Sequence, residues 1–305
     1  MKTVHYFLSV CICLCLAACT GNSEPGEEPE IEEPCPELAD VNPHFAYGDI
    51  PDLAARLAYM GMERPADSYN YPVYPGMDGS NDRWFAATDS GRNSMKVCQV
   101  MPECLLKKMS TQAAIQAIWE LPHLWHFVWV YEPYYQKGIE FQKNYYNAYE
   151  ELYNRKDAGA ALFERLTLID PLTPFLRYES QHLELLLSRT DFLSQLNESE
   201  KRKTVEITLS NDSIRYAEWG NVLGNFTAFT LRPTAWILMG KAMYVAGYGP
   251  FIKAMNEHEE LKYFVEGWRP NPRDPSKRDD YLYWELFYGT TPQIIMDHAK
   301  NYIND

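Results

Sequence analysis

Glu120, His123 and His126 follow one another at intervals of three residues, and carboxylates and imidazoles are groups that perform chemistry. On one unbroken helix this spacing would bring them together as metal ligands or as an acid–base pair. Pro122 interrupts that helix, because proline lacks an amide proton and its ring clashes with the preceding turn. We therefore interpret the histidines as imidazoles packed in an aromatic helix with satisfied N–H groups, and we predict no metal site here.

A second cluster, Glu257–Glu260, combines three carboxylates with His258. Neighbouring residues of a helix point about 100° apart, so most of this cluster is expected to face water rather than to gather a cation. The chain also lacks the H-E-x-x-H, G-x-S-x-G, phosphate-loop and calcium-loop motifs. The sequence thus predicts no catalytic residue, no metal and no cofactor. A hydrolase whose acid–base carboxylates come from separate helices is the alternative that leaves no local motif.

Residues 1–18 have the three zones of a secretory signal, with a basic start, an apolar core from Tyr6 to Leu16 and small residues at the end. The core is shorter than the roughly 20 residues that a membrane-spanning helix needs. Leu16-Ala17-Ala18-Cys19 resembles a bacterial lipobox. The resemblance implies cleavage before Cys19, lipidation of its thiol, and an acylated anchor that holds the protein on a lipid membrane.

Residues 19–48 are acidic and rich in proline, a composition that cannot bury enough apolar surface to fold and that predicts an extended tether. The whole chain has 42 acidic against 28 basic residues, a net charge of -14. With no basic stripe to displace counterions from phosphates, nucleic acid is excluded as a partner. Thr20 stands where Asp commonly marks inner-membrane retention, so the lipobox resemblance implies the cell outer membrane. The acidic run resembles a surface-export signal, and both a surface-exposed and a periplasm-facing position stay open.

Three cysteines remain for the folded part of the chain, Cys35, Cys98 and Cys104, in an oxidising compartment. Cys98 and Cys104 are the favoured disulfide pair. A continuous helix would set their Cα atoms about 9 Å apart, beyond the roughly 7 Å that a disulfide spans, so the bond requires a bend at Pro102. Two free thiols, or a bond from Cys35 to either of the others, are the alternatives.

Aromatic residues are abundant, with 22 Tyr, 8 Trp and 13 Phe. Most of the clusters fall within helical patterns, where the rings are expected to fill the core. Tyr69, Tyr71 and Tyr74 lie instead between prolines in a loop. Tyrosine offers a flat apolar face with a polar tip, which suits stacking on sugar rings or anchoring an interface. We therefore predict these three residues as a ligand-binding surface.

Helical patterns dominate the chain after Pro102. The expected N-caps are Ser110 for a helix over Thr111–Glu120, Asp157 for Ala158–Ile169 and Asn197 for Glu198–Ser210. Further helices are expected at 123–131, 134–154, 180–188, 234–246 (opened by Pro233), 250–256, 257–266 and 291–303. The alternating run Thr204–Leu209 is outweighed by its helical flanks, and 217–232 reads as the main loop. We predict one all-α domain over residues 49–305, built of stacked helical hairpins in an irregular helical-layer or solenoid-like arrangement.

Three segments, Cys98 through Met109-Ser110-Thr111, Asn154–Gly159 and Phe192–Leu196, resemble a family of secreted, uncharacterised all-helical proteins from gut-type bacteria. The resemblance covers about residues 95–260. It implies a helical fold, and its motifs correspond to helix caps and packing, so it carries over no catalytic residue.

Together these features favour a membrane-tethered, non-catalytic binding or interaction module for a glycan, peptide or protein ligand. The envelope hydrolase with dispersed carboxylates is the enzymatic alternative, and an envelope assembly factor without a small ligand is a third possibility.

Overall fold

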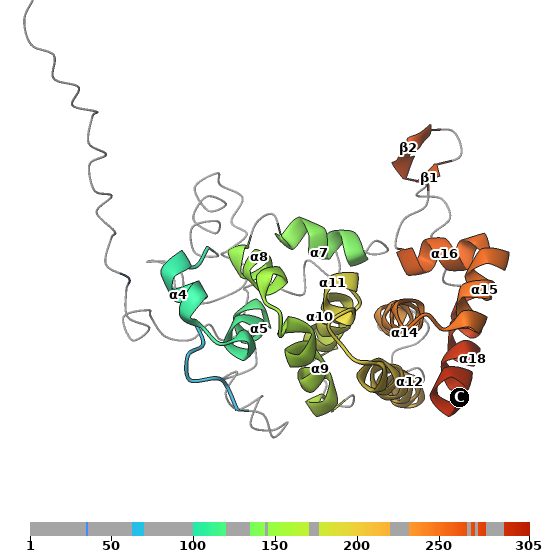
Figure 1. Ribbon diagram of the computed structural model, residues 1–305, viewed down its shortest axis with the longest axis horizontal. Helices are drawn as coiled ribbons and strands as arrows, with labels where there is room; N and C mark the ends of the chain where they lie inside the picture. Colours follow the sequence, from blue (N-terminus) through green and yellow to red (C-terminus); the bar gives the residue numbers. More distant parts are fainter. Residues whose placement is uncertain are drawn as a thin grey trace, which may run out of the picture. The chain divides into compact units, whose positions relative to one another are not determined.

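The computed structural model describes Cys35 and residues 63–69, 100–119, 135–143, 146–170, 177–219, 232–266, 270–271, 274–278 and 290–305. Cys35–Asp305 form one compact unit. Within the described ranges there are twelve helices and one pair of short antiparallel strands, β1 (Pro270–Asn271) and β2 (Asp274–Arg278) (Figure 1). The prediction of an all-α fold is confirmed. The finer arrangement as stacked hairpins stays a prediction. Among the described helices, none combines the length and apolar character needed to span a bilayer.

The first described helices are α4 (Glu103–Lys108), α5 (Thr111–Trp119), α7 (Tyr135–Lys143), α8 (Asn147–Asn154) and α9 (Ala158–Leu168). Ser110 caps α5 as predicted, since its Oγ accepts the Ala113 N–H at 3.2 Å. The prediction of a single helix over 134–154 is wrong, because two helices, α7 and α8, occupy this range. Its interruption includes Tyr146, whose backbone is extended (φ -126°, ψ 112°) and whose side chain is buried between the two helices' ends.

Cys104, in the first turn of α4, forms a disulfide with Cys35, and the two Cα atoms lie 5.9 Å apart. The favoured Cys98–Cys104 pairing is therefore wrong, and the alternative partner Cys35 is confirmed; Cys98 lies outside the described residues. The chain before α4 is held by Asn147, whose side chain accepts the Met101 N–H at 3.0 Å and donates to the Met101 carbonyl at 2.7 Å. These bonds hold Met101 against the start of α8. Cys35 belongs to the segment predicted as the tether, so the disulfide fixes one residue of that segment to the domain.

The next three helices are α10 (Arg177–Leu187), α11 (Thr190–Leu193) and α12 (Glu198–Trp219). Asn197 caps α12 as predicted: its Oδ1 accepts the Glu200 N–H at 3.0 Å, and Glu200 Oε2 accepts the Asn197 N–H at 2.8 Å. The Thr204–Leu209 alternation is helical, as expected. However, α12 continues beyond the predicted end at Ser210.

The second half of α12 is stabilised by a tertiary contact that a helix pattern does not reveal. Asp212 accepts two hydrogen bonds from the Arg232 guanidinium, at 2.9 and 2.7 Å. The same guanidinium lies between the rings of Tyr216 and Trp236, 4.4 and 4.9 Å from their centroids. The predicted loop over 217–232 is wrong at Ala217–Trp219, which are helical; 220–231 lie outside the described residues.

The last helices are α14 (Pro233–Val245), α15 (Gly249–Glu257), α16 (Glu259–Glu266) and α18 (Thr291–Asn304). Pro233 opens α14 as predicted. Every residue from Pro233 to Gly240 is buried, because α14 packs against α10, α12, α16 and α18. Gly240 permits the close approach of α16, since a Cβ there would lie 2.8 Å from a Val265 methyl group. In Figure 1 this helix lies among α10, α12, α16 and α18, the four helices that cover it.

Replacing Gly159 with alanine is expected to lower the free energy of unfolding by about 1–3 kcal/mol through overpacking. A Cβ on Gly159 of α9 would overlap the Phe192 carbonyl oxygen and lie 2.9 Å from Gln195 Cβ. The matched control is Gly249→Ala, where nothing lies within 4 Å of the added methyl group. Urea unfolding of both variants measures the difference, and equal midpoints would contradict the close approach of α9 and α11.

Candidate functional site

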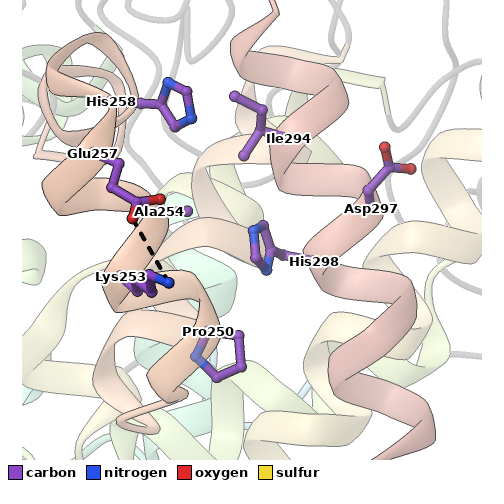
Figure 2. Close-up of a pocket in the computed structure, with 8 residues that line it drawn as sticks. All are labelled: Pro250, Lys253, Ala254, Glu257, His258, Ile294, Asp297 and His298. Carbon is purple, nitrogen blue, oxygen red and sulfur yellow. Dashed lines mark ion pairs between the residues drawn. The ribbon is translucent and has the colours of Figure 1, made fainter.

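A pocket of about 460 Å³ lies between α15 and α18 (Figure 2). This volume is within the range of small-molecule sites. Its lining residues are Pro250, Lys253, Ala254, Glu257 and His258 from α15 and its C-cap, and Ile294, Asp297 and His298 from α18. On each helix they are spaced three and four residues apart, which places them on one face. The pocket thus follows one face of each helix rather than a loop.

The turn before α15 fixes the direction of that helix. Gly247 has a positive φ of 70°. Its N–H bonds the Tyr244 carbonyl, and the Tyr248 N–H bonds the Met243 carbonyl, both at 3.0 Å. This is a Schellman motif, in which glycine adopts the left-handed conformation at little cost and ends the helix. The chain leaves α14 and enters α15 after three residues, and the opposite face of α15 is buried through Phe251 and Met255.

His298 is the central polar residue of the pocket. Its imidazole, together with Ile294, projects from α18 toward α15 (Figure 2). The ring makes edge contacts with Phe251 and Tyr248, with centroids 5.6 and 6.4 Å apart. Burial lowers the pKa of His298, although the neighbouring Asp297 carboxylate opposes the shift, so the imidazole is neutral at physiological pH. Its Nδ1 is buried and has no hydrogen-bond partner within the described ranges.

The charged residues of the pocket are paired on their own helices. Lys253 and Glu257 of α15 lie 3.8 Å apart, and both are exposed. Asp297 accepts a hydrogen bond from Gln293 at 2.8 Å and pairs with Lys300 at 3.4 Å. Both interactions lower the pKa of the Asp297 carboxyl, with the Gln293 hydrogen bond the larger cause. Its carboxylate points away from α15 (Figure 2). Each charge is therefore compensated on its own helix, and these pairs share the lining with imidazole and apolar groups.

The predicted tyrosine surface is wrong at Tyr69, which is only 4% exposed and belongs to the core. Asp67 explains this burial: its carboxylate accepts the Ser110 N–H at 2.6 Å and the Ser110 hydroxyl at 3.1 Å, which docks residues 63–69 on the start of α5. Six further candidates from the sequence lie outside the described residues: Cys19, Tyr71, Tyr74, Glu120, His123 and His126.

The Glu257–Glu260 run is exposed, as expected. Its first two residues nevertheless line the pocket, because α18 supplies the opposite wall. In the part of the chain that the structure describes, no three His, Cys, Asp or Glu side chains form a group that could hold a metal ion. Sequence reasoning missed His298. The sequence did contain a pattern that could have identified it. His298 comes four residues after Ile294, so both lie on one face of a helix whose inner face is otherwise apolar.

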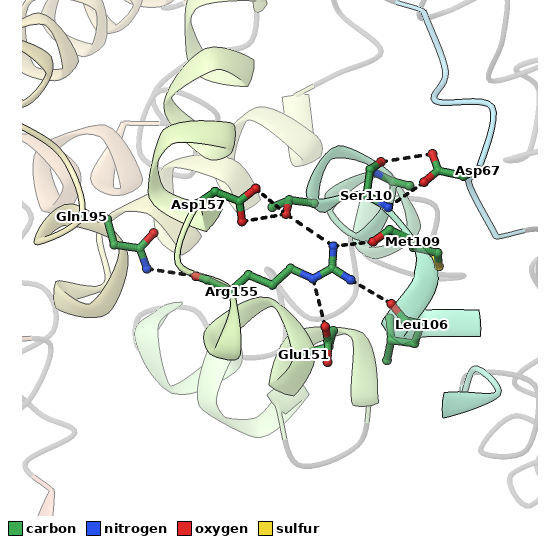
Figure 3. Close-up of polar contacts among 10 residues, drawn as sticks. Asp67, Leu106, Met109, Ser110, Glu151, Arg155, Asp157 and Gln195 are labelled. Carbon is green, nitrogen blue, oxygen red and sulfur yellow. Dashed lines mark hydrogen bonds and ion pairs between the residues drawn. The ribbon is translucent and has the colours of Figure 1, made fainter. Parts of the chain in front are cut away.

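A second polar cluster gathers the motifs that carry the family resemblance (Figure 3). Arg155 donates to the Met109 and Leu106 carbonyls at 2.7 and 2.8 Å, and its carbonyl accepts from Gln195 at 3.2 Å. Asp157 precedes α9 as predicted, but its carboxylate does not cap the helix; it accepts the Thr111 hydroxyl at 2.8 Å. The cluster joins the ends of five helices, α4, α5, α8, α9 and α11, and since these groups satisfy one another we assign it a structural role.

The fold and the pocket define an all-α protein with a small-molecule-sized site between two helices. No family model, curated protein or solved structure matches this chain.

Proposed function

We propose that this protein is an outer-membrane lipoprotein that binds a small ligand in the α15–α18 pocket without transforming it. The observation that carries the proposal is the position of the His298 imidazole, which lines the pocket and packs edge-on against Phe251 and Tyr248. A neutral imidazole offers one donor and one acceptor. A polar ligand in the pocket that hydrogen-bonds this ring would gain about 0.5–1.5 kcal/mol from the contact.

The composition of the pocket supports a binding role. Ligand sites combine an apolar lining with a small number of placed polar groups. Here Pro250, Ala254 and Ile294 provide apolar surface, while His258 and His298 provide imidazoles. The rigid edge contacts of His298 with Phe251 and Tyr248 hold its ring in one orientation, which reduces the entropy lost on binding.

The tether is compatible with a domain held at a distance from a membrane. Residues 20–34 separate the proposed lipidated Cys19 from Cys35, which the disulfide joins to α4. Fully extended, this stretch spans about 50 Å. A ligand-binding domain on such a tether can sample the solution near the membrane.

Replacing His298 with phenylalanine is expected to weaken ligand binding about tenfold, because the ring packing is kept while the hydrogen bond between the imidazole and the ligand is lost. The experiment uses the full chain after signal removal, with Cys19→Ser, on glycan and peptide arrays and then by calorimetry on the hits. Tyr244→Ala, an exposed residue of α14, is the control. Unchanged affinity in His298→Phe for every hit would refute the pocket as the site, and turnover of a hit would favour the hydrolase alternative.

Replacing Cys19 with serine is expected to move the protein from the membrane fraction to the soluble fraction and to abolish incorporation of labelled fatty acid. The thiol is the atom that carries the lipid, and serine does not replace it. Ser23→Ala, outside the lipobox, is the control and should stay in the membrane fraction. Membrane retention with lipid labelling in Cys19→Ser would contradict the proposed anchor.

A further inference from the structure

We infer that the ligand of the α15–α18 pocket is an uncharged, hydroxyl-rich segment of a glycan, about two sugar rings long. This inference rests on the proposed binding function and adds the chemical class of the ligand. Three properties of the pocket lead to it: the compensation of its charges, its alternation of donors and acceptors, and its length.

Charge compensation disfavours a strongly charged ligand. Lys253 is paired with Glu257, and Asp297 with Lys300, each within one helix. An anionic ligand would have to displace Glu257 from Lys253, and a cationic one would have to compete with two lysines. His298 adds no fixed charge, since burial lowers the pKa of its imidazole and keeps it neutral. An uncharged ligand loses no ion hydration on entering such a site.

The lining offers both donors and acceptors close to apolar surface. A sugar hydroxyl is one donor and two acceptors, so it needs both kinds of partner within a short distance. A neutral imidazole provides one of each, Lys253 donates, and Glu257 accepts. Ala254 and Ile294 give the apolar surface on which the C–H face of a ring can lie. A hydrocarbon ligand would leave these polar groups unpaired.

The length of the pocket favours more than one ring. Its lining follows α15 from Pro250 to His258, about 12 Å at the rise of an α-helix. His298 stands on the opposite helix between these ends (Figure 2). A disaccharide laid along α15 would contact both imidazoles, whereas a single ring would reach one of them.

The test titrates the Cys19→Ser chain with neutral disaccharides of different linkages, with digalacturonic acid, with the dimer of glucosamine and with neutral tripeptides. Dissociation constants come from calorimetry, and contact with the pocket is read from the ¹⁵N signals of the His298 and His258 imidazoles. At least one neutral disaccharide is expected to shift both imidazole signals and to bind at least tenfold more tightly than the charged sugars. His298→Phe should weaken that binding about tenfold.

A charge variant sharpens the test without disturbing the core. Glu257 is exposed, so Glu257→Lys keeps the fold but gives the pocket two uncompensated lysines. We expect this variant to reverse the preference toward digalacturonic acid. The matched control is Glu206→Lys, which breaks the equally exposed Lys203–Glu206 pair on α12 and should change neither preference.

The outcomes separate the two proposals. If charged sugars or peptides shift the imidazole signals and neutral sugars do not, the ligand class is wrong and the binding function stands. If no probe shifts either signal and the array hits bind His298→Phe as tightly as the unmodified chain, the proposed function fails together with this inference.

Discussion

Replacing Glu184 with alanine is expected to lower the free energy of unfolding by about 3–5 kcal/mol. Glu184 of α10 is fully buried, and its partner Arg215 of α12 has a side chain only 6% exposed. Their ion pair measures 2.7 Å, and the other carboxylate oxygen accepts the Thr234 hydroxyl of α14. Removing the carboxylate leaves a buried guanidinium without its counterion, because the desolvation cost remains and the attraction is lost.

A double-mutant cycle distinguishes the loss of a charge partner from the loss of packing. Arg215→Met combined with Glu184→Met should recover much of the stability, because both charges leave the interior together. Glu206→Ala, which breaks an exposed ion pair on α12, is the matched control and should change stability by less than about 0.5 kcal/mol. Equal urea midpoints for Glu184→Ala and Glu206→Ala would contradict the stabilising contacts of Glu184 with Arg215 and Thr234.

Helix starts could be predicted because their signals are local. Ser110, Asn197 and Pro233 each act within four residues of the bond or turn they form, so their roles can be read along the chain. Asp157 shows the limit of this reasoning. It stands at the predicted position, but Thr111, which packs against it from α5, competes successfully for its carboxylate.

Features that depend on distant segments could not be predicted in the same way. The partner of Cys104 lies 69 residues away, and the burial of Tyr69 follows from a hydrogen bond between Asp67 and Ser110. The pocket is a similar case. His258 was recognised as part of a solvated cluster, yet its role as a pocket residue requires His298 on the opposite wall. Sequence patterns identify the face of each helix, whereas packing decides which faces meet.

Lowering the pH from 7 to 5 is expected to destabilise the protein by about 2 kcal/mol through His182 alone. Burial lowers the pKa of His182 from 6.5 to about 3. The unfolded chain therefore binds a proton near pH 6.5 while the folded protein does not. This contribution to stability is complete above pH 6.5 and is lost at about 1.4 kcal/mol per pH unit as the pH falls toward 3.

The surroundings of His182 explain why the folded protein resists protonation. His182 Nε2 lies 2.6 Å from the Tyr149 hydroxyl and 3.0 Å from Gln142 Oε1, and that hydroxyl donates to the same oxygen at 2.5 Å. In the tautomer that fits this network, Nε2 carries the proton. Protonation would place a second N–H on Nδ1, which is buried and has no partner among the described residues. Among the described residues, the groups within hydrogen-bond distance of the charge would be the neutral side chains of Tyr149 and Gln142.

The measurement is urea unfolding at pH 7 and pH 5 for the unmodified chain and for His182→Gln. The loss of stability between the two pH values should be about 2 kcal/mol smaller in the variant, because glutamine does not titrate. Leu168→Gln, at an exposed position on α9 that carries no titratable group, is the control and should keep the pH dependence of the unmodified chain. Since the pKa of His298 is also lowered, a residual loss in His182→Gln is expected, and His298→Phe should reduce it further. Identical pH dependence in His182→Gln and the unmodified chain would show that His182 is protonated at pH 5 without unfolding, which this buried network does not permit.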